Sequence, residues 1–76
     1  MTRSYRIGNI ALVERVAARI KQLREKRGMT QEQLAEKVGI SRAYLARIET
    51  ARHNLTVPML ERLSNALRVK PARLLE

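Results

Sequence analysis

The side chains in this sequence that could do chemistry are mostly cationic. Sixteen Lys and Arg residues stand against seven Asp and Glu residues, so the 76-residue chain carries a formal net charge of +9 at pH 7. Guanidinium and ammonium groups at this density favour a polyanionic partner, because they attract negatively charged molecules to the protein surface. Net charge does not choose among DNA, RNA and an anionic membrane, so the positions of the cations have to decide.

Residues for catalysis or metal binding are scarce. The sequence has no Cys, which removes disulfides, thiolate metal ligands and a cysteine nucleophile together. His53 is the only histidine, so neither a histidine metal site nor a Ser-His-Asp arrangement can be built around it. Glu32 and Glu36 are four residues apart on an expected helix, where we interpret them as surface residues. The sequence therefore predicts a protein that is not an enzyme and uses neither metal nor cofactor.

The most informative cations lie on a short helix that follows a tight turn. The pattern predicts helices over 31–38 and 42–50, joined by the three residues Gly39, Ile40 and Ser41. Such a turn is typical of a helix-turn-helix, whose protruding second helix fits a DNA major groove about 12 Å wide. The first residues of that helix reach the base edges. We therefore expect the base-reading residues to be Arg42, Ala43, Tyr44 and Arg47.

The elements around this unit are also expected to be helices. Apolar residues at helical spacing predict a helix over about 10–27 that stops at Gly28. Thr56 and Pro71 mark the starts of two later helices. No alternating β-branched run predicts a strand. The sequence thus predicts an all-α, compact five-helix bundle over residues 10–76, preceded by a flexible basic arm over residues 1–9.

Several short motifs resemble a known family at its own spacing. They are Leu23-Arg24, Gly28-Met29-Thr30-Gln31, Leu34-Ala35, Val38-Gly39-Ile40-Ser41, Tyr44-Leu45, Ile48-Glu49, Leu60 and Ala66-Leu67. The chain resembles the Cro/C1-type, or XRE-like, helix-turn-helix proteins related to the lambda repressor, over about residues 12–75. The runs 41–45 and 52–56 are also similar to the controller proteins of restriction–modification systems, which are stand-alone chains of this size that act as dimers on a promoter.

The resemblance implies roles for individual residues. The residues that it implies contact DNA phosphates are Gln31, Gln33, Arg52, His53 and Asn54. It also implies a structural salt bridge between Arg24 and Glu49. Ala51 stands where the family often has Gly, so the backbone there must avoid a positive φ or tolerate mild strain. Lys70 replaces the usual Ser or Thr, so the last helix lacks its usual cap.

These observations favour a sequence-specific regulator that binds double-stranded DNA as a homodimer. Two copies would read two-fold related half-sites about 34 Å apart. The residues expected at the dimer interface are Leu67, Val69, Leu74 and Leu75, which are apolar beyond what a small core needs. If the protein activates transcription, it would also contact RNA polymerase.

Other functions remain open at this point. An antitoxin-type protein would use the same fold to bind DNA and also cover a protein partner. Binding of the first helix to a membrane surface is a less favoured alternative, because no Trp or Phe is present to anchor the helix. No apolar run approaches the ~18 residues of a membrane span. We therefore expect a cytoplasmic protein of bacterial or phage type, associated with the nucleoid and not with a membrane.

Overall fold

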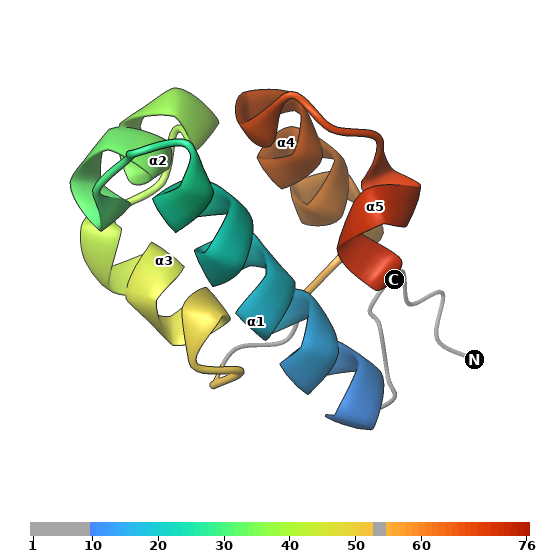
Figure 1. Cartoon of the computed structure of the whole chain (residues 1–76). Coiled ribbons are helices and arrows are strands. Elements are labelled where there is room, and N and C mark those ends of the chain that lie inside the picture. The colour runs from blue at the N-terminus through green and yellow to red at the C-terminus, as the bar shows by residue number, and fades with distance from the viewer. Residues whose placement is uncertain (1–9, 53–54) are drawn as a thin grey trace.

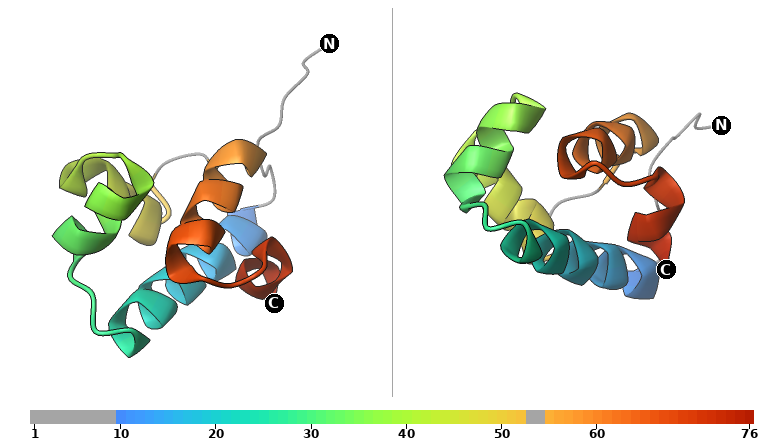
Figure 2. Two further views of the ribbon diagram at one scale, coloured as in Figure 1. Left: turned by 90° about the horizontal axis from the view of Figure 1, so that it is seen from above. Right: turned by 45° about the horizontal axis from the view of Figure 1, so that its top comes forward.

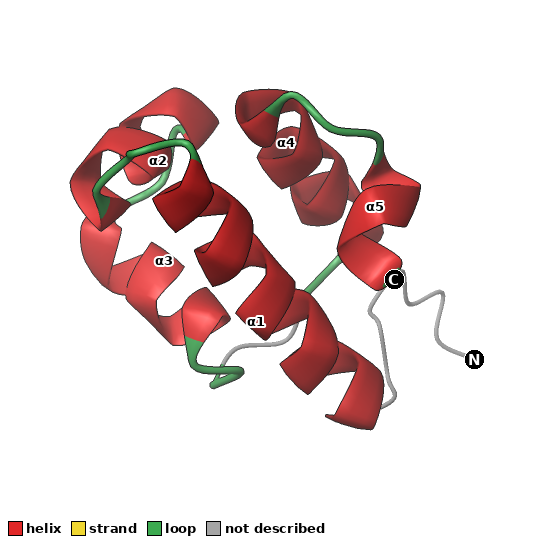
Figure 3. Ribbon diagram, viewed as in Figure 1, coloured by secondary structure: helices red, strands yellow, loops and turns green. Residues whose placement is uncertain are grey.

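The computed structural model describes residues 10–52 and 55–76, and these residues form helices joined by short loops (Figure 1). The helices are α1 (Ile10–Lys26), α2 (Gln31–Val38), α3 (Arg42–Glu49), α4 (Val57–Leu67) and α5 (Pro71–Leu75). Within the described ranges there is no strand (Figure 3). The all-α prediction is confirmed, and the expected helix limits agree with the structure to within one or two residues.

The helix limits follow from local hydrogen bonds that the sequence encodes. At the start of α2, the Gln33 N–H donates to Thr30 Oγ1 at 3.0 Å, and the Thr30 N–H donates to Gln33 Oε1 at 2.9 Å. This reciprocal pair satisfies two N–H groups that the helix itself leaves unpaired. Gly39 ends α2 in the left-handed conformation with φ 85°. The Ser41 and Thr56 hydroxyls accept from the first turns of α3 and α4, and Thr56 marks the start of α4 as predicted.

Helix α1 lies between two pairs of helices (Figure 2). Helix α3 packs on one side of it, with α2 packed against α3, while α4 and α5 pack on the other. α4 also packs against α2, which closes the bundle. None of the helices in the described residues is long and apolar enough to span a membrane.

Two residues of the predicted dimer interface lie instead in the hydrophobic core. Leu67 and Leu74 are both 0% exposed, because their side chains fill the core of a single subunit. They are therefore wrong as interface residues. Leu55, which follows the polar residues Arg52, His53 and Asn54 in the sequence, is 2% exposed and belongs to the same core. Val69 is partly buried and Leu75 is 37% exposed, so their part in an interface stays a prediction.

The loop after α3 contains a strained alanine. Ala51 has φ 59°, so it tolerates the left-handed conformation instead of avoiding it. Its N–H donates to the Ile48 carbonyl at 3.1 Å, and the Arg52 N–H donates to the Arg47 carbonyl at 2.8 Å. These bonds hold the backbone in the conformation that glycine adopts without cost.

We expect Ala51→Gly to raise the free energy of unfolding by about 0.5–1 kcal/mol. The left-handed conformation costs an L-residue about 1–2 kcal/mol, and the greater backbone freedom of unfolded glycine offsets part of the gain. Urea denaturation at constant m-value measures the change. Ala18→Gly on the exposed face of α1 is the matched control, and it should lose about 1 kcal/mol. Equal losses in both variants would contradict the assignment of strain to Ala51.

Candidate nucleic-acid interface

Helix α3 presents one face to the core and another to solvent. Leu45 and Ile48 are 0% and 3% exposed and anchor the helix on α1 and α2. Arg42, Ala43 and Arg47 are exposed on the other side. An exposed helix that follows a three-residue turn has the shape that enters a major groove. The structure thus leaves three of the four predicted base-reading side chains accessible.

Tyr44, the fourth predicted base-reading residue, is placed differently. Its side chain is half-buried and packs against the hydrophobic core. Its N–H donates to Ser41 Oγ at 3.0 Å, because it occupies the third position of the helix. Part of the ring is therefore used for packing, and contact of its remaining edge with a base stays a prediction.

A buried ion pair joins α1 to the end of α3. Arg24 Nε donates to Glu49 Oε2 at 2.7 Å, and Arg24 Nη2 donates to Glu49 Oε1 at 3.1 Å. The two side chains are 9% and 2% exposed. Hydrogen bonding to the Glu49 carboxylate raises the pKa of Arg24, against the opposing effect of burial. Arg24 Nη1 also donates to the Met29 carbonyl at 2.8 Å. The predicted salt bridge is confirmed.

The ion pair continues to the surface through two further hydrogen bonds. Gln31 Nε2 donates to Glu49 Oε1 at 3.0 Å. Arg42 Nη1 then donates to Gln31 Oε1 at 3.2 Å. The connected side chains Arg24, Glu49, Gln31 and Arg42 are called the arginine relay below. The relay brings together a predicted phosphate-contacting residue and a predicted base-reading residue, a connection that sequence reasoning missed. No spacing rule within one helix gives it, because the partners lie on different helices.

The other predicted phosphate-contacting residues differ in their availability. Gln33 Oε1 accepts the Thr30 N–H, so its amide oxygen is used by the helix cap. Arg52 is exposed directly after the left-handed Ala51. His53 and Asn54 lie outside the described residues, as does the predicted arm over residues 1–9. In the part of the chain that is described, no three His, Cys, Asp or Glu side chains cluster as metal ligands would.

Comparison with known sequences gives a family match over most of this chain. The model of the helix-turn-helix family HTH_3 matches residues 20–74. The immunity repressor protein of Bacillus phage phi105 is 47% identical over 55 residues, which are 72% of this chain and 38% of the repressor. The chain therefore spans less than half the length of that relative.

Solved structures with the same fold include two restriction–modification controller proteins. C.AhdI from Aeromonas hydrophila has a TM-score of 0.80 and 30% identity, over 84% of this chain and 97% of that one. C.Esp1396I, solved as a tetramer in complex with its natural 35 base-pair operator, has a TM-score of 0.77 and 38% identity. That match covers 83% of each chain.

Proposed function

Because this chain belongs to the helix-turn-helix family HTH_3, we propose that it binds double-stranded DNA sequence-specifically and regulates transcription. The observation that carries this proposal is the arginine relay, which runs from the buried Arg24 to the exposed Arg42. It holds the first residue of α3 against the first residue of α2. An oriented guanidinium at that position suits base recognition, because less side-chain freedom is lost on binding.

In the proposed complex, the N-terminal end of α3 enters the major groove. Arg42 donates to the O6 and N7 atoms of a guanine, the commonest specific contact of an arginine with DNA. Gln31 lies at the N-terminal end of α2, where the helix dipole favours a phosphate. Since Gln31 and Arg42 are hydrogen-bonded to each other, the phosphate contact and the base contact become mutually oriented.

The distribution of charge supports separate sources of affinity and specificity. Residues 28–54 contain four cations and three acidic residues, whereas residues 1–27 contain eight cations and two acidic residues. The helix-turn-helix is thus nearly neutral, and most of the excess charge lies elsewhere. We assign that excess to sequence-independent attraction for the DNA backbone. Specificity then depends on the few side chains of α3 that face solvent.

The proposed active form is a homodimer on two-fold related half-sites. One α3 helix covers too little of the groove for a long operator, and a second copy one helical turn away doubles the contact. C.Esp1396I is a tetramer on its operator, which supports assembly of related chains on DNA. Leu75 is a large apolar residue of α5 that is exposed and, with Val69, remains a candidate for the interface.

The relatives favour a repressor or controller over the antitoxin alternative, which none of the proteins named above supports. A regulator of either kind would act in the cytoplasm of a bacterium, on its own promoter or on a phage operator. If it activates transcription, RNA polymerase becomes a further partner.

We expect Arg42→Ala to cost about 1–3 kcal/mol of binding on a duplex selected from a random DNA pool, and to relax the preference at one base pair. Arg52→Ala removes the same charge from a predicted phosphate contact. It should weaken the selected duplex and a scrambled duplex by the same factor and lower the salt slope by about 1. Fluorescence anisotropy on both duplexes measures these changes. If both variants lost the same affinity on both duplexes, the base-reading role of Arg42 would be wrong.

A further inference from the structure

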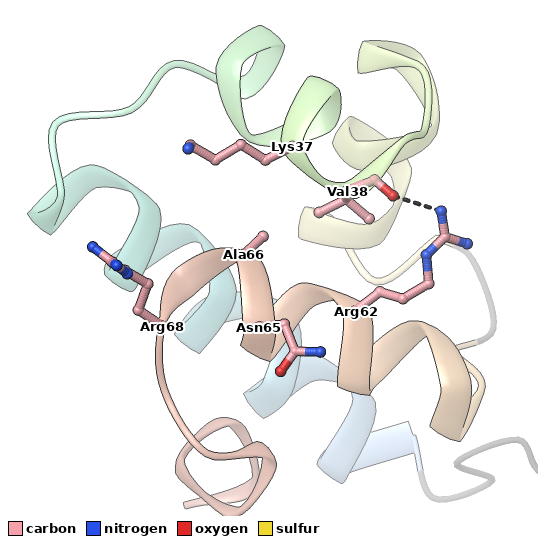
Figure 4. A pocket seen from close by; sticks show the side chains of 6 residues that line it. All are labelled: Lys37, Val38, Arg62, Asn65, Ala66 and Arg68. Carbon is pink, nitrogen blue, oxygen red and sulfur yellow. Dashed lines mark hydrogen bonds between the residues drawn. The ribbon is translucent and has the colours of Figure 1, made fainter.

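A groove lies between the C-terminal end of α2 and the side of α4 (Figure 4). It has a volume of about 610 Å³. Its lining residues are Lys37, Val38, Arg62, Asn65, Ala66 and Arg68. Arg62 crosses this groove from α4, and its Nη2 donates to the Val38 carbonyl at 2.5 Å. The guanidinium thus ties α4 to the last residue of α2, directly before the turn that leads into α3.

The turn at Gly39 lies directly beside this guanidinium. Gly39 has φ 85°, and a Cβ atom added there would lie 3.0 Å from Arg62 Nη2. The Gly39 and Ile40 N–H groups both donate to the Ala35 carbonyl, at 2.8 and 3.0 Å. Glycine suits position 39 because of its left-handed backbone conformation, and the end of the Arg62 side chain lies close beside it.

Electrostatics favours a cation at this place. The last carbonyls of a helix have no partner within the helix and carry the negative end of its dipole. Lys37, in the last turn of α2, supplies one charge from the same helix. Arg62 comes from a different helix, so its bond does more than satisfy a carbonyl, because it fixes the end of α2 relative to α4.

Arginines from outside the helix-turn-helix thus hold the last residue of α3 and the residue before the turn that leads into α3. Arg24 of α1 holds Glu49, the last residue of α3. Arg62 of α4 holds Val38, the last residue of α2, directly before the turn that leads into α3. These two attachments add to the packing of Leu45 and Ile48 in the core and together restrict the direction of α3.

We propose that Arg62 is a positioning residue for DNA recognition, which fixes the turn at Gly39 and thereby the angle at which α3 presents its first residues. The inference rests on the proposed DNA-binding function. It predicts that Arg62 contributes to the discrimination between DNA sequences although it does not touch a base.

The first test uses the free protein and does not depend on DNA. Hydrogen exchange of the Gly39 and Ile40 amides is compared in Arg62→Ala and Arg68→Ala. Arg68 lines the same groove and carries the same charge, and no side-chain hydrogen bond ties it to the turn. We expect exchange about tenfold faster at these two amides in Arg62→Ala alone, since a charge-assisted bond lost there lowers the local opening energy. Unchanged exchange would overturn the attachment.

The second test measures specificity as the ratio of Kd on a scrambled duplex to Kd on a duplex selected by the unmodified protein. We expect Arg62→Ala to lower this ratio by about three- to tenfold, the worth of one lost hydrogen bond. Arg68→Ala should weaken both duplexes alike, because it removes only charge. A role limited to stability would reduce the folded fraction and leave the ratio unchanged, which would overturn the proposal. Equal binding of both duplexes by the unmodified protein would instead overturn the proposed function, while faster exchange at Gly39 would still support the attachment.

Should Arg62→Ala be unfolded at the assay temperature, Arg62→Lys provides the second variant. It keeps the charge on α4 but replaces the planar fork by a single ammonium group. Faster exchange at the Gly39 and Ile40 amides and a lower Kd ratio than in the unmodified protein and Arg68→Ala support the proposal. A Kd ratio and exchange rates equal to those of the unmodified protein would reduce Arg62 to a source of charge and overturn it.

Discussion

We expect Arg24→Ala to lower the free energy of unfolding by about 3–5 kcal/mol, because it leaves the Glu49 carboxylate buried without its partner. The Glu49 side chain is 2% exposed, and both of its oxygens accept from Arg24. The Gln31 amide, which also donates to Glu49, cannot replace a charged partner. For a chain of 76 residues such a loss is a large share of the total stability. Thermal or urea denaturation followed by circular dichroism measures it.

Two variants control for this result. Arg27→Ala removes an exposed cation shortly after α1 and should change stability by less than about 0.5 kcal/mol. The double variant Arg24→Met with Glu49→Leu removes both charges and replaces them by apolar side chains. It should be more stable than Arg24→Ala, because no unpaired charge remains in the core. A loss within experimental error for Arg24→Ala would falsify the importance of the pair.

We expect the affinity for DNA to fall by about 10³- to 10⁵-fold between 50 and 200 mM salt, if a dimer makes about 6 to 10 phosphate contacts. The net charge of +9 per chain supplies the cations for contacts of that number. Each neutralised phosphate releases condensed counterions, so binding weakens as the salt concentration rises. Anisotropy titrations at four or five salt concentrations give the slope of log Kd against log salt.

The same titrations on a scrambled duplex are the control. Its slope should be close to that of the selected duplex, because the phosphate contacts are largely shared. Only the offset between the two lines should reflect base reading. A flat response on both duplexes would contradict binding to the DNA backbone.

The local features of the fold were accessible from the sequence because each is encoded within a few residues. Thr30 with Gln33, Ser41 and Gly39 specify helix limits through bonds that span three or four positions. The helix-turn-helix itself follows from these signals. The Arg24–Glu49 pair spans 25 positions, and only the family resemblance indicated it.

Features that depend on packing between distant helices could not be predicted in this way. Leu67 and Leu74 looked like surplus apolar residues, because the sequence does not show how α4 and α5 close over α1. Leu55 follows the polar residues Arg52, His53 and Asn54, so nothing in the sequence marks it as a core residue. The bond between Gln31 and Arg42, and that between Arg62 and the Val38 carbonyl, require coordinates for the relative placement of two helices.

The arginine relay has one end in the core and one end in solvent, and this asymmetry bears on how such proteins diverge. We expect a change of Arg24 or Glu49 alone to cause a folding defect. Arg42 is exposed, so its substitution leaves no unpaired charge in the core. If Arg42 reads a base as proposed, mutations at position 42 alter which operator is recognised while the scaffold is inherited unchanged. A gene duplicate of this chain could acquire a new regulatory target through a single codon, and selection would act on that target separately from selection on folding.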